Sequence, residues 1–362
     1  MNKSQTLPDF PWDTIADDIA LAESHPGGVC DLSVGTPVDP VPEIGRRALA
    51  EAANAHGYPA VWGTPQLRAA IISYMRTRWS APELADRNVL PVIGTKELVG
   101  WLPTLLNLGA GDTVVIPAAA YPTYAVGAVM VGARVVTAAS PDDVADESPR
   151  LVWTNSPSNP TGQVDDLART KAWIEYARAK GAVLAADECY GEFGWDAEPV
   201  SVLDERVNGG SLEGLLGAYS MSKRSNLAGY RAGFVVGDES VVMELLALRK
   251  HLGMMVPTPV QAAMTVLLGD HQHVDQQRAR YAARREVLSK ALVAAGFRID
   301  DSQAGLYLWA TRGENGRLTS HWLAERGIIV APGDFYGTAG ADHVRIALTA
   351  TDDRIAAAAS RL

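Results

Sequence analysis

The chain has 362 residues, which is more than one small core requires and suits one large domain with a smaller one. Hydrophobic residues make up 47% and charged residues 20%, the balance of an ordinary soluble globular protein. The formal net charge of −10 argues against a nucleic-acid partner, because phosphate binding needs a positive field.

The N-terminal stretch MNKSQTLPDFPWDTIADD contains prolines and acids where a signal peptide would need an uninterrupted apolar segment. No apolar run approaches the roughly eighteen residues of a membrane span. Cys30 and Cys189 are the only cysteines and lie far apart, so we expect no disulfide, no cysteine-based zinc site and no other bound metal. These features predict a cytoplasmic protein that does not contact a membrane.

From about residue 89 to residue 250, short apolar runs alternate with helix-like segments. Continuous hydrophobicity without in/out alternation predicts strands that are buried on both faces. The runs are VLPVI (89–93), TVVIP (113–117), RVVTA (134–138), LVWTN (151–155), AVLAAD (182–187), LLGAYS (215–220) and AGFVVG (232–237). The intervening segment 165–181 begins with acids and ends with a glycine, as helices do. This alternation predicts an α/β fold with a mostly parallel sheet flanked by helices.

The segment GMMVPTPVQAA (253–263) interrupts this rhythm with two prolines. A long helical stretch follows it, and the tail contains three further strand candidates. They are LYLWAT (306–311), IIVAPG (328–333) and HVRIAL (343–348). We therefore predict a large domain over residues 41–255 and a small α+β domain over 256–362. We expect residues 1–40 to form an N-terminal arm that completes part of the small domain.

Polar side chains follow several predicted strands at the points where the strands end. Asn159 lies shortly after the run 151–155, and Asp187 closes the run 182–187. In open α/β sheets, ligands bind outside the carboxyl ends of the strands. We therefore expect these two side chains to gather at one edge with others in the same position, namely Thr95, Lys96, Ser220, Ser222 and Lys223.

The stretch YSMSKRSNLAGYRAGF (219–234) holds one lysine, Lys223, with Arg231 eight residues downstream. Two interpretations compete. SMSK (220–223) matches the S-x-x-K of serine acyl-enzymes, or Lys223 itself forms a Schiff base with a carbonyl compound such as pyridoxal phosphate. Serine acyl-enzymes also need S-D-N and K-T-G elements, which the sequence lacks. No G-x-G-x-x-G follows an early strand, so a dinucleotide enzyme is also disfavoured.

A pyridoxal phosphate enzyme has physical requirements that these residues can meet. Its lysine must be deprotonated at working pH, which partial burial and nearby cations favour. A carboxylate such as Asp187 must keep the pyridine nitrogen protonated. The phosphate needs N–H groups at a helix start together with hydroxyls and a cation, and Gly94, Thr95 and Arg231 are among the candidates. An aromatic ring should stack on the cofactor, and Tyr121 is suitably placed.

Four motifs in chain order resemble the class I/II aminotransferases of pyridoxal phosphate fold type I. They are NSPSNPTG (155–162), ADECY (186–190), SMSK (220–223) with its downstream arginine, and HVRIALTA (343–350). The resemblance runs over nearly the full chain, from DLSVGTP (31–37) through GYPAVWGTPQLRAAI (57–71) to the last motif. It implies a large domain that binds pyridoxal phosphate, a small domain, and amino-acid and 2-oxo-acid substrates.

The resemblance also assigns the catalytic residues. It implies that Lys223 joins the cofactor through an imine and that Asp187 pairs with the pyridinium nitrogen. Asn159 and Tyr190 would hydrogen-bond the phenolic oxygen of the ring, which lowers the imine pKa by stabilising its unprotonated, anionic form. Tyr121 would stack on the ring.

The same resemblance assigns the binding residues. The phosphate would be held by the backbone at Thr95 and Lys96, by the hydroxyls of Ser220 and Ser222, and by Arg231. Tyr58 matches a tyrosine that reaches the phosphate of the neighbouring subunit, so a homodimer is expected. Arg345, helped by Gly35 and Asn159, would bind the substrate α-carboxylate with a bidentate fork. Lys96 departs from the small or amide residue of many relatives and could contact either the phosphate or the substrate.

Within the family, the chain looks most like the actinobacterial N-succinyldiaminopimelate aminotransferases of lysine biosynthesis, which use glutamate and 2-oxoglutarate as the second pair. Alternatives are an aminotransferase for aspartate or for an aromatic or aliphatic amino acid, and a C–S lyase. The succinyl carboxylate should meet a second cation, for which Lys96, Arg224 and Arg249 are candidates.

Overall fold

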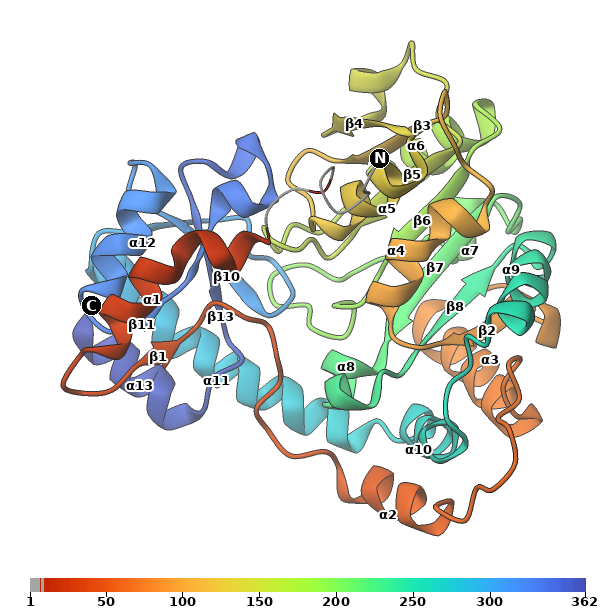
Figure 1. Ribbon diagram of the computed structural model, residues 1–362, viewed down its shortest axis with the longest axis horizontal. Coiled ribbons are helices and arrows are strands. Elements are labelled where there is room, and N and C mark those ends of the chain that lie inside the picture. The colour runs from red at the N-terminus through yellow and green to blue at the C-terminus, as the bar shows by residue number, and fades with distance from the viewer. Residues whose placement is uncertain (1–6, 8–9) are drawn as a thin grey trace.

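The computed structural model describes residue 7 and residues 10–362 (Figure 1). Residues 1–6 and 8–9, which belong to the predicted N-terminal arm, lie outside the described residues. Two bodies of secondary structure lie side by side, one around a seven-stranded sheet and one around a four-stranded sheet. Within the described part of the chain, every helix is too short or too polar to cross a bilayer.

The larger sheet confirms the predicted α/β fold class. Its strand order is β2-β8-β7-β6-β5-β3-β4, and only β8 runs antiparallel to its neighbours. The strands match the apolar runs to within a residue or two. They are β2 (Val89–Val92), β3 (Thr113–Pro117), β4 (Arg134–Ala138), β5 (Leu151–Asn155), β6 (Val183–Asp187), β7 (Leu215–Ser220) and β8 (Gly233–Gly237).

Helices cover both faces of this sheet, which explains why its central strands lack polar alternation. In β5, Val152 packs into the core on one face, whereas Leu151 and Trp153 pack into the core on the other. The first face is covered by α3 (Pro65–Trp79), α6 (Leu167–Ala179), α7 (Glu205–Asn208) and α10 (Thr258–Gly269), with α2 (Glu43–Glu51) packed on α10. The second is covered by α4 (Thr95–Leu105), α5 (Thr123–Val131) and α9 (Glu239–Leu252), while α8 (Met221–Arg224) follows β7 directly.

The smaller sheet has the order β12-β13-β10-β9 and is antiparallel. Its strands are β9 (Arg298–Asp300), β10 (Tyr307–Thr311), β12 (Ala331–Pro332) and β13 (Val344–Ala347). A separate parallel pair joins β1 (Cys30–Asp31) to β11 (Ile328–Ile329). Around them lie α1 (Ala16–Glu23), α11 (Gln272–Ala294), α12 (Gly316–Ala324) and α13 (Asp352–Arg361).

The predicted strand 328–333 differs from the structure, because it is divided into β11 and β12. The two halves pair with different partners, β1 and β13, and the chain must turn between them at Val330. The 3-10 helices are Pro11–Ile15, Asp86–Asn88, Pro141–Val144, Ala228–Tyr230, Gly333–Tyr336 and Thr338–Gly340. The domain boundaries expected near residues 40 and 255 stay predictions.

Candidate active site

Three parallel strands end together at the carboxyl edge of the larger sheet. Asn155 at the end of β5 pairs in register with Asp187 at the end of β6, and Asp187 pairs with Ala218 of β7. Ser220, which ends β7, leads directly into α8 and Lys223. The structure therefore brings the strand-end residues to one edge, as the sequence pattern indicates.

Asp187 is a buried carboxylate with neutral hydrogen-bond donors around it. Its Oδ2 accepts from the Tyr124 hydroxyl at 2.9 Å, and its Oδ1 accepts from the backbone N–H of Cys189 at 3.2 Å. Burial raises the pKa of Asp187, and no cation forms an ion pair with it in the described part of the chain. Because an isolated buried charge is costly, this carboxylate suits a cationic group such as a protonated ring nitrogen.

Lys223 lies in α8 with its ammonium nitrogen against the chain segment that follows β1. Its Nζ donates to the carbonyl of Gly35. Burial lowers the pKa of Lys223; Arg345 and Arg231 act in the same direction, against Tyr307 and Cys189. A lowered pKa increases the neutral fraction of the amine, which is the form that acts as a nucleophile.

An anion-binding corner forms where α4 begins. Gly94 precedes the helix with φ of +80°, and a Cβ at this position would collide with the guanidinium of Arg231. Arg231 therefore lies directly against the helix start, whose first N–H groups lack intrahelical partners. Ser220 and Ser222 are buried nearby, and the Ser220 hydroxyl accepts from the Ser222 N–H at 3.1 Å. A phosphate fits this combination of donors.

Arg345 lies on β13 of the smaller sheet, and its side chain extends toward the larger body. It is only 3% exposed. Its Nη1 donates to Oδ1 of Asn159 at 2.8 Å, and its Nη2 donates to the carbonyl of Ser33. Asn159 is itself fixed by a hydrogen bond from its N–H to Asn155 at 2.7 Å. The Nε of Arg345 is buried and has no hydrogen-bond partner among residue 7 and residues 10–362. This free donor suits an incoming carboxylate.

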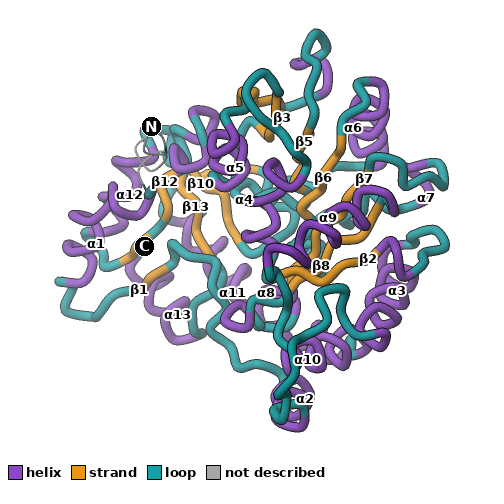
Figure 2. Tube along the Cα trace, turned by 45° about the vertical axis from the view of Figure 1, so that its right-hand side comes forward, coloured by secondary structure: helices purple, strands orange, loops and turns teal. Residues whose placement is uncertain are grey.

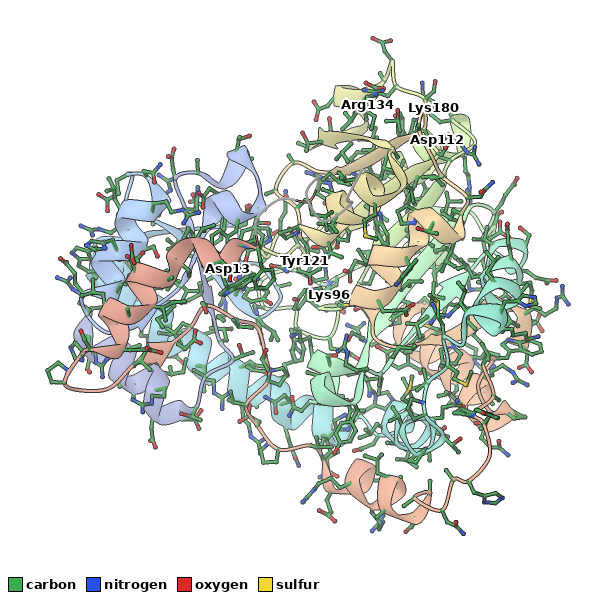
Figure 3. All side chains as sticks on the ribbon, in the orientation of Figure 1. Asp13, Lys96, Asp112, Tyr121, Arg134 and Lys180 are labelled. Atoms are coloured by element: carbon green, nitrogen blue, oxygen red, sulfur yellow. The ribbon has the colours of Figure 1, made fainter. Side chains whose placement is uncertain are left out.

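Tyr121 and Lys96 lie next to each other in the candidate site (Figure 3). The Lys96 Nζ lies 5.9 Å from the centroid of the Tyr121 ring, and Tyr121 contacts Tyr124 edge to face with centroids 5.9 Å apart. Lys96 is exposed and has no carboxylate within ion-pair distance in the described chain. A cation therefore remains free next to an aromatic face.

Tyr58 is the predicted site residue that the structure does not bring to the others. It lies in the loop between α2 and α3 and is 98% exposed. The remaining predicted residues gather around Lys223, and the chemical roles given to them stay predictions.

Sequence reasoning missed residues that contact this group. Tyr307 on β10 forms a hydroxyl contact with Tyr190 at 2.9 Å, and Cys189 places its sulfur 3.2 Å from the Thr95 hydroxyl. The position of Cys189 within ADECY could have pointed to it. Tyr307 belongs to an apolar strand run, LYLWAT, and nothing in that pattern separates it from a core aromatic residue.

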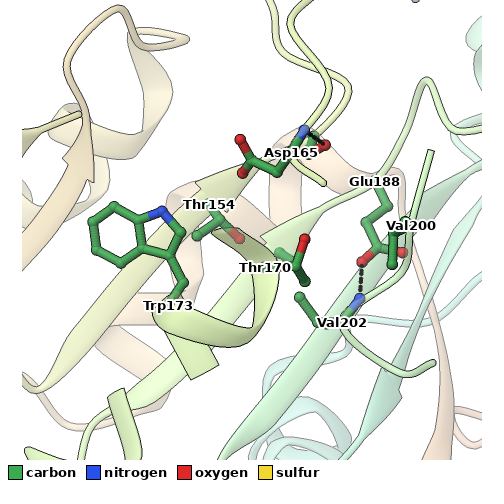
Figure 4. Close-up of a pocket in the computed structure, with 9 residues that line it drawn as sticks. Thr154, Asp165, Thr170, Trp173, Glu188, Val200 and Val202 are labelled. Atoms are coloured by element: carbon green, nitrogen blue, oxygen red, sulfur yellow. Dashed lines mark hydrogen bonds between the residues drawn. The ribbon is translucent and has the colours of Figure 1, made fainter. Parts of the chain in front are cut away.

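A small pocket lies on the face of the larger sheet that α6 covers, and Thr170 and Trp173 of α6 contribute to its lining (Figure 4). It has a volume of about 10 Å³, room for one water molecule. Glu188 and Asp165 contribute carboxylates to its lining. Glu188 accepts from the Tyr219 hydroxyl at 2.6 Å and from the Val202 N–H at 2.8 Å, and burial raises its pKa to about 7.

Replacing Glu188 with glutamine should flatten the pH dependence of stability between about pH 5 and pH 8. The folded pKa of about 7 exceeds the usual value of 4.5, so the folded state binds more protons in this interval and loses stability as the pH rises. The effect reaches about 3 kcal/mol, at about 1.4 kcal/mol for each pKa unit. Urea titrations of both proteins at several pH values test it. Unfolding free energies that change in parallel would contradict it.

Comparison with known proteins identifies the family. The model of the family described as aminotransferase class I and II matches residues 28–362. A probable aminotransferase of Mycobacterium tuberculosis is 58% identical over 359 residues, which cover 99% of this chain and 86% of that protein. The 4-dedimethylamino-4-oxo-anhydrotetracycline transaminase OxyQ of Streptomyces rimosus is 52% identical, over 98% of this chain and 99% of that protein. Among solved structures, a probable N-succinyldiaminopimelate aminotransferase from Thermus thermophilus has a TM-score of 0.88 at 27% identity, over 97% of this chain and 99% of that one. The chain belongs to the class I and II aminotransferases.

Proposed function

We propose that this aminotransferase exchanges an amino group between two pairs of compounds in lysine and diaminopimelate biosynthesis. One pair is glutamate and 2-oxoglutarate, and the other is N-succinyl-LL-2,6-diaminopimelate and its keto counterpart. The observation that carries the proposal is the pair of cations at the site. Arg345 is buried with a free Nε, and Lys96 is exposed without a carboxylate partner in the described chain. Glutamate carries one carboxylate besides its α-carboxylate, and N-succinyl-LL-diaminopimelate carries two, so each donor would use at least one cation in addition to Arg345.

Enzymes of this family depend on pyridoxal phosphate, and the described residues fit it. The cofactor, when bound, supplies an electron-withdrawing ring that stabilises negative charge at the substrate α-carbon. Asp187 would hold a proton at the ring nitrogen, and Tyr190 and Asn159 would donate to the phenolic oxygen of the ring. Tyr121 would cover one ring face. The phosphate would be held by the backbone N–H groups of Thr95 and Lys96 at the start of α4, by the hydroxyls of Ser220 and Ser222, and by Arg231.

The chain's own groups would then bind the substrate and move its proton. The guanidinium of Arg345 grips the α-carboxylate, and Asn159 and Gly35 hold that carboxylate in place. The Nζ of Lys223 would take the proton from the substrate α-carbon, and burial favours the neutral, proton-accepting form of this amine by lowering its pKa. Its contact with the Gly35 carbonyl orients the amine.

Members of this family act on amino and oxo acids and are typically dimers. We propose a homodimer in which Tyr58 reaches the phosphate of the neighbouring subunit. Its 98% exposure in the single chain supports this role, because the side chain is available to contact a neighbouring subunit. Light scattering of the purified protein checks the dimer, and a monomeric mass would contradict it. A cytoplasmic location, which is inferred from the cysteine usage, stays a prediction.

Of the three cations considered for binding the distal carboxylate, Lys96 is supported best, because it is exposed and has no carboxylate partner in the described chain. Arg249 is 0% exposed and makes a two-pronged ion pair with Glu97 at 2.9 and 3.0 Å. Arg224 is also buried, where it pairs with Glu192 at 3.0 Å and donates to the carbonyl of Leu267 at 2.6 Å. If Arg224 or Arg249 turned to the substrate, its carboxylate partner would remain as an unpaired charge in the interior. The expectation that these two arginines bind the succinyl carboxylate is therefore corrected.

Replacing Lys96 with methionine should raise KM for glutamate and for N-succinyl-LL-diaminopimelate by about 10- to 100-fold, because a hydrogen bond to a charged group contributes about 1.5–3 kcal/mol. Neutral amino acids should lose much less. Lys250→Met on α9 is a matched control, since that lysine is also exposed. If Lys96 instead binds the phosphate, all substrates lose equally and the cofactor dissociates more readily, which would refute the distal role.

The identity to OxyQ supports a second candidate, in which the oxo substrate is a larger ring ketone of the kind in that protein's name. Rates of amination should be compared for the keto counterpart of N-succinyl-LL-diaminopimelate, for the unsuccinylated compound, and for 4-dedimethylamino-4-oxo-anhydrotetracycline. The proposal expects the succinylated acid to have the highest kcat/KM. A preference for the ring ketone, or for an aspartate, aromatic or aliphatic partner, would replace it.

A further inference from the structure

Tyr307 is a buried tyrosine that no assigned role uses. It lies on β10, beside β13 with Arg345 (Figure 2), and is 3% exposed. Its hydroxyl lies 2.9 Å from the hydroxyl of Tyr190, and the two rings meet edge to face with centroids 5.5 Å apart. The contact joins Tyr307 of the smaller sheet to Tyr190, which lies in the segment after β6. It therefore links the two bodies at the candidate site.

The surroundings of Tyr307 contain further proposed site residues. The guanidinium carbon of Arg345 lies 4.0 Å from the centroid of the Tyr307 ring, within the range of a cation–π contact. A Cβ on Gly35 would collide with the Tyr307 hydroxyl, so the glycine lets this hydroxyl approach the backbone. The carbonyl of the same Gly35 accepts from Lys223.

A count of hydrogens fixes the direction of the contact between the two tyrosines. Each phenol has one hydrogen to donate. If Tyr190 donates its hydrogen to the phenolic oxygen of the cofactor, the bond between the tyrosines must be donated by Tyr307. Hydrogen bonds in such a chain polarise one another, so a donor behind Tyr190 makes Tyr190 a stronger donor. Burial alone would raise the pKa of Tyr307, yet the nearby Arg345 cation lowers it, which strengthens its phenol as a donor.

We propose that Tyr307 is a positioning residue that donates a hydrogen bond to Tyr190 and thereby strengthens the bond from Tyr190 to the ring oxygen of pyridoxal phosphate. The proposal rests on the role given to Tyr190 in the proposed function. It also means that the position of β10 affects the electronics of the cofactor, because the contact joins residues of the two bodies.

Tyr307→Phe tests the proposal in the holoenzyme without substrate. Phenylalanine keeps the ring on which Arg345 packs and removes only the hydroxyl. The visible absorption of the bound cofactor is titrated against pH. Its apparent pKa should rise by roughly 0.1 to 0.7 unit, because the bond from Tyr190 to the anionic ring oxygen weakens by about 10–30% without the donor behind it. Tyr176→Phe on α6 is the control. It removes a hydroxyl that donates to the Val144 carbonyl at 2.8 Å, and it should leave the titration unchanged.

Tyr190→Phe and the double variant separate this proposal from the assignment beneath it. Tyr190→Phe should raise the apparent pKa further than Tyr307→Phe, and the double variant should match Tyr190→Phe alone. If only Tyr190→Phe shifts the pKa, the role of Tyr190 stands and that of Tyr307 is refuted. If the two shifts add, Tyr307 does not act through Tyr190, and the proposal fails. If neither variant shifts it, the role of Tyr190 falls and takes the proposal with it.

Discussion

Replacing Lys223 with alanine should lower kcat/KM by at least about 10⁴-fold, the scale expected when a nucleophile that also transfers a proton is removed. The lysine holds this position because β7 ends at Ser220 and α8 begins at once, which directs Nζ to the carbonyl of Gly35. Lys96, the other lysine of the candidate site in the described part of the chain, is exposed beside Tyr121 and is not placed to substitute for it. Steady-state kinetics with N-succinyl-LL-diaminopimelate as amino donor and 2-oxoglutarate as acceptor measure the loss.

The variant should remain folded, since alanine removes a partly buried amine whose pKa is already lowered by burial. Lys250→Ala on the exposed side of α9 serves as the control and should keep full activity. Dialysis offers a second measurement, because the Lys223 variant should lose pyridoxal phosphate that the control retains. Activity of Lys223→Ala within about tenfold of the unmodified enzyme would rule out its role as the reacting amine.

Replacing Asp187 with asparagine should lower kcat by about 10³-fold or more, because an amide carries no charge to keep the ring nitrogen protonated. The substitution is nearly isosteric, and its carbonyl oxygen can still accept from Tyr124, so the packing of the strand end should persist. Glutamate preserves the charge but displaces it, and Asp187→Glu should fall between the two. Single-turnover kinetics with glutamate separate the chemical step from binding.

Asp165→Asn provides the matched control for Asp187. Asp165 is another carboxyl whose pKa is raised by burial, but it lines the small pocket on the α6 face of the larger sheet and pairs with Arg169 at 2.9 Å. Its replacement should change kcat by less than about twofold. Equal losses in the two variants would show that the effect arises from burying an amide and not from a charge at the cofactor.

The larger sheet could be predicted from sequence because its strands are buried on both faces. Runs such as LVWTN and LLGAYS have no polar alternation, and helices on both sides explain why. The strand-end rule then located Asp187 and Lys223 without any contact being known. The small strand β9, with the polar sequence RID, gave no such signal, and two-residue strands such as β11 and β12 depend on partners far along the chain.

Side-chain pairing was the part that sequence could not supply. From the sequence, Arg224 and Arg249 could be free cations. In the structure both are buried and form ion pairs with Glu192 and Glu97, so they stabilise the fold. Tyr307 looked like a core aromatic, and only the register of β10 against β13 reveals its contact with Arg345. These relations join residues that are distant in sequence, and local patterns do not encode them.

The most direct test of the account is a visible absorption spectrum of the purified protein with pyridoxal phosphate, taken before and after adding glutamate. The account predicts a cofactor band in the visible range that disappears with glutamate and returns with 2-oxoglutarate. It also predicts that neither change occurs in Lys223→Ala. A protein that binds the cofactor but shows no reversible change with this pair would contradict the glutamate assignment. The same cycle proceeding unchanged in Lys223→Ala would contradict the site.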